Sequence, residues 1–452
     1  MKNSVPLSVA MKRKIEDILL HWKSIPHHKP LVIKGCRQCG KTYSVLEFAR
    51  KNYANVVYID FHRYEAYKDI FADSLEPNDL LMKISLAVPN CKLEPRCTCI
   101  IFDEIQECPR ARAALKFLHL DGRYDYICTG SLLGVSGYRS PNEDEEISSI
   151  PVGYETIVDM YPMDFEEFLW ANGVNCDTIN YLQQSLQRET PIDSFVHQRM
   201  RNFLLQYVIV GGMPAAVDAF VNTHNMVDVL SLQRAIIDEY KADMVKYASR
   251  VDKARIRKCF ESIPTQLSRE NKKFTYATIE KGARAKDYWS CLQWIEDAGI
   301  IRRCRNLNIT ELPLEGNARN DIFKVYMADT GLFVSMLEEG TQTSIINGDL
   351  LGYKGAIFEN LVADMFGKMG RKLYYFHKDS GLELDFVIRY KGQCVPVECK
   401  AQSGRTKSLQ TVLTHSEKYH VQSAIKLGDY NIGREGSLLT LPLYMGFLLR
   451  EM

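Results

Sequence analysis

The sequence lacks several features that would place it in particular classes of protein. No apolar run approaches the roughly 20 residues that a membrane-spanning helix needs, and the N-terminus has no apolar core of a secretory signal. The net charge is only +1, so whole-molecule electrostatics does not point to nucleic acid, and any basic surface has to be local. We therefore expect a cytoplasmic protein without membrane association. With 452 residues, 46% of them hydrophobic, the chain can hold roughly three domains with buried cores.

The strongest motif spans residues 35–42, reads Gly-Cys-Arg-Gln-Cys-Gly-Lys-Thr and fits G-x-x-x-x-G-K-[ST]. It lies between a strand-like run at 31–33 and a helical pattern at 43–53. In such a loop, backbone N–H groups and the helix N-terminus bind phosphate. Lys41 is expected to reach the β- and γ-phosphates of ATP, and Thr42 to hold Mg²⁺. The candidate nucleotide-binding residues are Gly35, Cys36, Arg37, Gln38, Cys39, Gly40, Lys41, Thr42 and Tyr43.

Two acids complete a candidate ATPase site. The apolar run 98–102 ends in Asp103 and Glu104; the first can hold Mg²⁺, and the second can orient and deprotonate the attacking water. The next predicted strand ends in Thr129 and Ser131, which would lie near the γ-phosphate because ligands bind at the carboxyl ends of parallel strands. The alternation of strands and helices predicts an α/β fold with a doubly wound parallel sheet around the P-loop. ATP hydrolysis with Mg²⁺ is the predicted activity.

The two loop cysteines do not indicate a metal site. Cys36 and Cys39 have C-x-x-C spacing, but no second cysteine pair or histidine pair accompanies them. Thiols near a helix N-terminus tend to be acidic. Reversible oxidation of either thiol, blocking ATP binding, is therefore a hypothesis.

The chain divides into four predicted segments. Residues 1–162 form the ATPase core, and helical periodicity over 163–248 predicts a helical lid. Residues 249–339 indicate three helices and a β-hairpin, the plan of a winged helix, and residues 340–352 a linker that opens a C-terminal α/β domain, 340–452. A local basic set lies near the expected recognition helix and wing: Arg284, Lys286, Arg302, Arg303 and Arg305. This set either contacts DNA phosphates, or it forms a solvated face or belongs to a packing module inside the ATPase.

The C-terminal segment carries an acid on one predicted strand and acid-x-lysine on the next. Glu398 and Lys400 share a face of their strand, and Asp385 joins them if the two strands form a hairpin. Glu359, on the preceding helix, is a further candidate metal ligand. Carboxylates that hold Mg²⁺ beside a lysine that positions water are typical of a metal-dependent nuclease. An edge hairpin with exposed charges is the alternative.

These motifs together resemble bacterial and archaeal AAA+-like ATPases of the STAND-related group, which end in a domain similar to PD-(D/E)xK nucleases. The resemblance rests on the phosphate loop, the Asp385/Glu398/Lys400 set and the runs 102–106, 129–134, 161–168, 211–214 and 324–332. It implies that Pro214 lies near adenine, that Thr129 or Ser131 senses the γ-phosphate, and that the C-terminal domain is nuclease-like. It provides no arginine finger.

Two functions remain open at this point. In the first, ATP hydrolysis drives a winged-helix module on duplex or branched DNA, which the nuclease-like domain binds or cuts. In the second, the chain is a nucleotide-dependent regulatory switch whose nuclease-like domain is inactive and serves recognition. A variant of the first function makes ATP-gated cleavage by the nuclease-like domain the output. Assembly into a homo-oligomer stays open in both.

Overall fold

The N-terminal region is built on a five-stranded parallel sheet. The computed structural model describes residues 11–132, 153–246, 250–347, 354–400 and 406–451. The strand order is β2-β3-β4-β1-β5, and every neighbouring pair is parallel. The bounds are β1 Leu31–Gly35, β2 Asn55–Asp60, β3 Thr98–Asp103, β4 Asp125–Ser131 and β5 Thr156–Met160. The predicted α/β fold with a parallel P-loop sheet is confirmed.

Helices cover both faces of this sheet because successive strand side chains point to opposite sides. Leu31 and Ile33 pack with Leu19 of α1 and Phe48 of α2, whereas Val32 belongs to a second cluster with residues of α3 and α4. The helix bounds are α1 Ile15–Ser24, α2 Lys41–Asn52, α3 Pro77–Ala87 and α4 Pro109–Asp121. The sheet is therefore doubly covered, as parallel sheets require.

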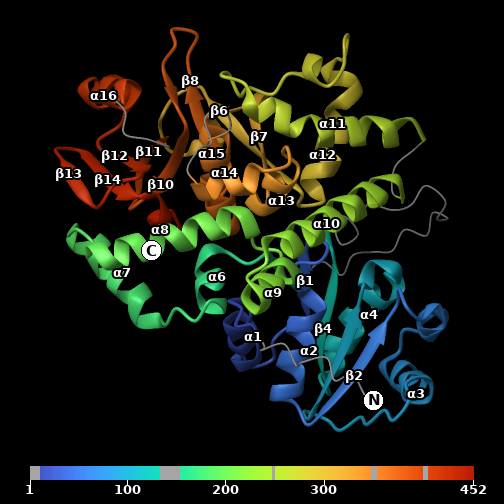
Figure 1. The fold of residues 1–452 in the computed structure, drawn as a ribbon. Helices are drawn as coiled ribbons and strands as arrows, with labels where there is room; N and C mark the ends of the chain where they lie inside the picture. The colour runs from blue at the N-terminus through green and yellow to red at the C-terminus, as the bar shows by residue number, and fades with distance from the viewer. Residues whose placement is uncertain (1–10, 133–152, 247–249, 348–353, 401–405, 452) are drawn as a thin grey trace.

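A layer of helices lies between much of this sheet and the rest of the chain (Figure 1). The helices are α6 Phe165–Ala171, α7 Cys176–Arg188, α8 Ser194–Val210, α9 Pro214–Thr223 and α10 Met226–Lys246. Their apolar side chains form one continuous core with residues as far along as Leu449. The segments predicted as lid, winged helix and C-terminal domain thus share a core.

Two further sheets complete the fold. One has the order β7-β6-β8-β9 and joins β6 Ile301–Leu307 and β7 Ala318–Met327 to β8 Leu373–His377 and β9 Glu383–Leu384. The other has the order β10-β11-β12-β14-β13, with β10 Phe386–Tyr390, β11 Gln393–Lys400, β12 Ala424–Gly428, β13 Gly433–Glu435 and β14 Leu438–Pro442. The helices of these parts are α11 Arg250–Ser268, α12 Ala285–Asp297, α13 Thr330–Ser335, α14 Thr341–Asn347, α15 Lys354–Lys368, α16 Lys407–Thr414 and α17 Ser416–Tyr419.

Two expectations about this half of the chain need correction. The predicted linker at 340–352 begins with helix α14, whose Thr341 and Ile345 are buried. Arg303, expected on an exposed basic face, is only 4% exposed. Its guanidinium pairs with Glu296 of α12. Arg303 therefore points from β6 toward the helix that packs on the sheet, and not toward solvent.

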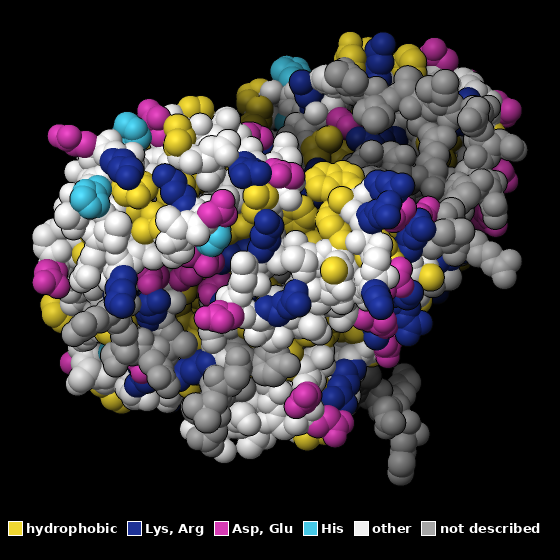
Figure 2. Space-filling model, turned by 90° about the horizontal axis from the view of Figure 1, so that it is seen from above, with side chains coloured by type: hydrophobic (Ala, Val, Ile, Leu, Met, Phe, Trp, Pro, Cys, Tyr) yellow, Lys and Arg dark blue, Asp and Glu magenta, His cyan; other side chains and the backbone are white. Residues whose placement is uncertain are grey.

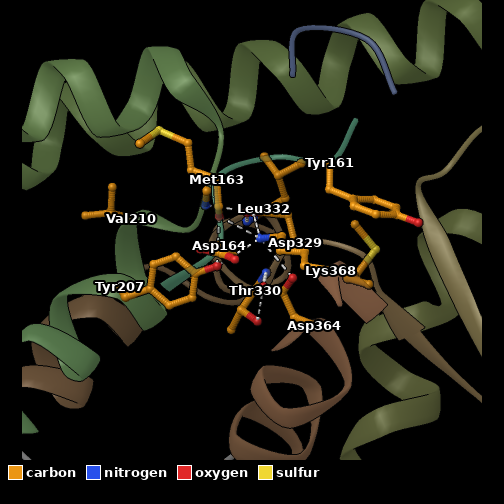
Figure 3. A network of polar contacts seen from close by, with 12 residues as sticks. Tyr161, Met163, Asp164, Tyr207, Val210, Asp329, Thr330, Leu332, Asp364 and Lys368 are labelled. Atoms are coloured by element: carbon orange, nitrogen blue, oxygen red, sulfur yellow. Dashed lines mark hydrogen bonds and ion pairs between the residues drawn. The ribbon is translucent and has the colours of Figure 1, made fainter. Parts of the chain in front are cut away.

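A buried ion network joins three parts of the chain (Figure 3). Lys368, at the end of α15, donates to the Tyr207 hydroxyl at 2.9 Å and to the Met163 carbonyl at 3.2 Å. Its Nζ also lies 2.8 Å from Asp364 and 3.1 Å from Asp329. All three charged side chains of this group are buried. Burial raises the pKa of Asp364 to about 6, against the opposing charge of the lysine.

Backbone groups satisfy the remaining oxygens of the network. Asp329 accepts from the Gly212 N–H at 2.7 Å, and Asp364 accepts from the Thr330 N–H at 3.1 Å. A Cβ on Gly212 would lie 1.9 Å from the Met163 carbonyl oxygen, so only glycine fits there. The Gly-Gly-Met-Pro run of the sequence is thereby explained as a close packing contact.

Candidate functional site

The phosphate loop connects β1 to α2. Gly40, directly before α2, has φ +95°, a left-handed conformation that favours glycine. The Lys41 side chain is only 6% exposed, and its Nζ donates to the carbonyls of Gly35 at 3.1 Å and Cys36 at 2.9 Å. The lysine therefore lies inside the curl of the loop, where the phosphates of a nucleotide would bind.

Two residues predicted from separate stretches, Thr42 and Thr129, converge at Asp103. Thr42 Oγ1 donates to its two carboxylate oxygens at 2.9 and 3.0 Å, and the Thr129 hydroxyl donates to the same carboxylate. A hydroxyl beside a carboxylate is a donor set that suits Mg²⁺, so Thr42 and Asp103 would hold the ion. Bound there, the ion would neutralise charge on the nucleotide phosphates.

Tyr58, on the neighbouring strand β2, was not among the predicted residues. Its hydroxyl donates to Asp103 at 2.6 Å. Burial raises the pKa of Tyr58, and the hydrogen bond to the carboxylate raises it further. The sequence could have pointed to Tyr58, because it lies two residues before Asp60, the polar end of β2, and β2 runs parallel to β3.

Glu104 follows β3 with φ +52°, which turns its side chain away from the direction of the strand. The Gln106 side chain donates to Glu104 and accepts from the Ser131 N–H at 3.3 Å. Through these two hydrogen bonds, Gln106 connects the carboxylate of Glu104 to Ser131 at the end of β4. The role of Glu104 in activating water stays a prediction.

Arg13 supports the loop from behind and was missed by sequence reasoning. Its guanidinium donates to the Cys39 carbonyl at 2.9 Å, to the Tyr161 carbonyl at 2.8 Å and to Glu167 at 3.0 Å. Arg13 is 5% exposed. Nothing local in the sequence marks it, since Glu167 lies 154 residues away.

We expect Arg13→Lys to weaken ATP binding about tenfold, because lysine keeps the charge but cannot make three directed hydrogen bonds at once. The apparent KM for ATP should rise while kcat changes little, which steady-state phosphate release would measure. Arg50→Lys is the matched control, since Arg50 is an exposed residue of α2. Equal KM values for the Arg13 variant and the wild type would contradict this role.

Helix α10 contacts the outer side of the loop. The Tyr240 hydroxyl donates to the Arg37 carbonyl at 3.2 Å, and the Arg37 side chain pairs with Asp243 at 2.5 Å. Gln38 donates to Glu239 one turn earlier on the helix. Pro214, at the start of α9, also reaches the loop, because its Cγ would lie 3.4 Å from a Cβ on Gly40. The predicted contact of Pro214 with adenine stays a prediction.

The thiols of Cys36 and Cys39 are both buried. A hydrogen bond from Cys36 lowers the pKa of Cys39 to about 6, with help from the charges of Lys41 and Arg13. The pKa of Cys36 is raised by that same hydrogen bond and by burial. The oxidation hypothesis stays untested.

The C-terminal candidate residues also come together. β10 and β11 form the expected antiparallel hairpin, with Phe386 opposite Val397. Asp385 accepts from the Cys399 N–H at 2.8 Å, and Glu398 pairs with Lys400 at 2.5 Å. Burial and the charge of Glu359 raise the pKa of Asp385 to about 7. Among the described residues, Glu398 Oε2 is buried without a hydrogen-bond partner.

Glu359 fits a metal-ligand role less well. Lys272 and Tyr326 both donate to its carboxylate, the tyrosine at 3.0 Å. The buried Lys324 lies 3.8 Å from it and 2.6 Å from Glu383. Among the described residues, no group of three or more His, Cys, Asp or Glu side chains is arranged to hold a metal ion. The Mg²⁺ assignment of Glu359, Asp385 and Glu398 stays a prediction.

Comparisons with known proteins found a similarity in the N-terminal part. Residues 27–169 match the family model described as an AAA domain. This part of the chain is similar to AAA domains. Its fold supports ATP binding and hydrolysis. Residues 201–343 and 354–444 match two domains of unknown function, DUF8612 and DUF4143. A search of curated proteins found no match.

Two solved structures are similar over most of the chain but at low scores. The Walker-type ATPase PABY2304 of Pyrococcus abyssi has a TM-score of 0.41 and 13% identity, over 72% of this chain and 95% of that one. The Aeropyrum pernix ORC1 protein, solved in complex with DNA, has a TM-score of 0.29 and 12% identity, over 76% and 94%. Among the described helices of this chain, none is long and apolar enough to cross a membrane.

Proposed function

We propose that this AAA-type ATPase hydrolyses ATP to act on DNA through the module of residues 249–339. The observation that carries the proposal is the winged-helix order of α11, the short helix Tyr276–Thr278, α12 and the β6–β7 hairpin. The Phe274 N–H donates to the Phe323 carbonyl of β7 at 2.9 Å, at the position of the short first strand of that plan. In winged helices the third helix and the hairpin contact DNA.

The charges around α12 support this role. Lys281, Arg284 and Lys286 are exposed at its N-terminal end, and no ion pair is found for them among the described residues. Figure 2 shows the face that is uppermost in Figure 1, where Lys and Arg side chains are interspersed with Asp and Glu. A local basic cluster therefore matters more for DNA binding than the electrostatic field of the whole face. These three cations would contact DNA phosphates.

In the ATPase step, the Lys41 ammonium binds the phosphates and the Glu104 carboxylate takes a proton from the attacking water. Thr129 would sense the γ-phosphate and transmit its presence to Asp103, because the Thr129 hydroxyl donates to that carboxylate. The nuclease-like domain enters the proposal as a DNA-binding part. Its cutting activity would depend on Lys400, which pairs with Glu398.

DNA stimulation of ATP hydrolysis tests the proposal. We expect duplex or four-way DNA to raise the rate of phosphate release, and Arg284→Glu/Lys286→Glu to remove the increase while leaving the DNA-free rate unchanged. Arg319→Glu, at an exposed site on β7 where the arginine pairs with Asp321 at 2.9 Å, is the control. Absence of DNA binding at low salt in any form would overturn the proposal.

A nucleotide-dependent switch is the second candidate. The contacts of α10 with Arg37 and Gln38 favour it. A nucleotide that binds in the loop would act directly on these contacts and so on the helical layer. Slow hydrolysis, retained ADP and a rate unaffected by DNA are the results expected for a switch.

A further inference from the structure

Two lysines from the segment 249–339 reach the acids of the C-terminal candidate site. Lys272, which follows α11, donates to one carboxylate oxygen of Glu359. Lys324, on β7, lies 3.8 Å from the other oxygen of Glu359 and 2.6 Å from Glu383. The side chains of Glu359 and both lysines are largely shielded from solvent. Cations of one segment therefore neutralise acids of another.

Both carboxylate oxygens of Glu359 are engaged by these contacts. Oε1 accepts from the Lys272 ammonium, and Oε2 accepts from the Tyr326 hydroxyl at 3.0 Å. A divalent cation bound to Glu359 would lie beside the Lys272 ammonium. Like charges repel more strongly in a site shielded from water than in bulk solvent. The Lys272 ammonium and a metal ion therefore compete for Glu359.

The other two candidate ligands are less engaged by protein cations. Asp385 accepts from the Cys399 N–H at 2.8 Å, and Glu398 Oε1 lies 2.5 Å from Lys400. The affinity of oxygen ligands for a divalent cation depends on how many charged ligands the site supplies. Without Glu359, the set keeps only Asp385 and a glutamate that already has a lysine. Such a set attracts a divalent cation weakly.

Lys272 belongs to a short exposed stretch of the chain. Its neighbours Asn271 and Lys273 are exposed, whereas the Lys272 side chain is only 15% exposed because it turns toward Glu359. Lys324, in contrast, is 2% exposed and lies inside β7. Moving Lys272 would break one ion pair without opening a sheet. Lys272 is therefore the cation of this pair that can leave Glu359 more easily.

We propose that Lys272 is an autoinhibitory cation, which holds Glu359 and so keeps a divalent metal ion from binding with Asp385 and Glu398. This agrees with the finding that no three acidic, histidine or cysteine side chains of the described residues are arranged to hold a metal ion. Cleavage that depends on Lys400 would require Lys272 to leave first. The inference goes beyond the proposed function and does not depend on DNA binding.

Binding of Mn²⁺ to the full chain without nucleotide tests the proposal, with the free ion measured by electron paramagnetic resonance. Every protein in the comparison carries Asp103→Asn, which removes the carboxylate of the ATPase site. Lys272→Met keeps the length of the side chain and removes its charge. We expect it to bind Mn²⁺ at least about tenfold more tightly than the parent protein. Lys273→Met, at the exposed neighbouring position, should bind as the parent does.

Two further variants assign the ion to the acids. Adding Asp385→Asn or Glu359→Gln to Lys272→Met should remove the gained affinity. Glu359→Gln alone should leave Mn²⁺ binding unchanged, because Lys272 already prevents Glu359 from serving as a ligand. This last measurement tests the proposal even where Lys272→Met does not fold.

Three results would overturn the proposal. The first is equal Mn²⁺ affinity in Lys272→Met and the parent protein. The second is a gained affinity that survives Asp385→Asn, which would place the ion elsewhere. The third is a loss of Mn²⁺ binding in Glu359→Gln alone, which would show that Glu359 binds metal while Lys272 is present. The assay contains no DNA, so its failure would leave the proposed function unaffected.

Discussion

Replacing Lys368 with methionine is expected to lower the free energy of unfolding by about 3–5 kcal/mol. Methionine matches the length of the lysine stem, so packing is nearly kept, but Asp329 and Asp364 lose the cation that both contact. Two carboxylates would then be buried close together with only neutral donors around them. The cost of an unpaired buried charge far exceeds the net value of the pair itself.

Urea and thermal unfolding midpoints would measure this effect, with two variants for comparison. Lys372→Met removes an exposed ion pair with Glu315 and should change stability by less than about 1 kcal/mol. Asp364→Asn combined with Lys368→Met removes charges of both signs and should recover part of the loss. A Lys368→Met protein as stable as the wild type would show that the network in Figure 3 does not hold the three parts together.

Glu104→Gln is expected to reduce ATP hydrolysis by about 10²- to 10⁴-fold, because glutamine can still orient water but cannot accept its proton. ATP affinity should be nearly unchanged, since the phosphate contacts come from the loop and Lys41. The rate of phosphate release would measure the loss. Glu107→Gln, three residues further in the same short segment, should keep the wild-type rate. A Glu104→Gln enzyme with undiminished turnover would remove Glu104 from the mechanism.

The parts of the site that could be predicted are those with local patterns. The phosphate loop, the strand ending at Asp103 and the strand ending at Thr129 each carry a signal within a few residues. Parallel strands bring such ends to one edge of the sheet, and the bonds from Thr42 and Thr129 to Asp103 follow. The hairpin that joins Asp385 to Glu398 was predictable because only the two residues 391–392 separate its antiparallel strands.

The residues that could not be predicted have partners far along the chain. Arg13 contacts Glu167, and Lys272 contacts Glu359, each across loops and helices whose packing no local pattern encodes. Lys324 reads as an ordinary strand lysine yet is 1% exposed beside two carboxylates. Arg303 is buried because its guanidinium contacts Glu296 and Gln293 of α12, so its burial depended on how α12 packs on the face of β6.

The nucleotide that remains bound after incubation with MgATP tests the central claim most directly. Wild-type protein and the Glu104→Gln variant would each be incubated, separated from free nucleotide and analysed by anion-exchange chromatography. The account predicts ADP on the wild type and intact ATP on the variant. Equal amounts of ADP on both proteins, or no nucleotide on either, would contradict ATP hydrolysis at the site formed by Lys41, Asp103 and Glu104.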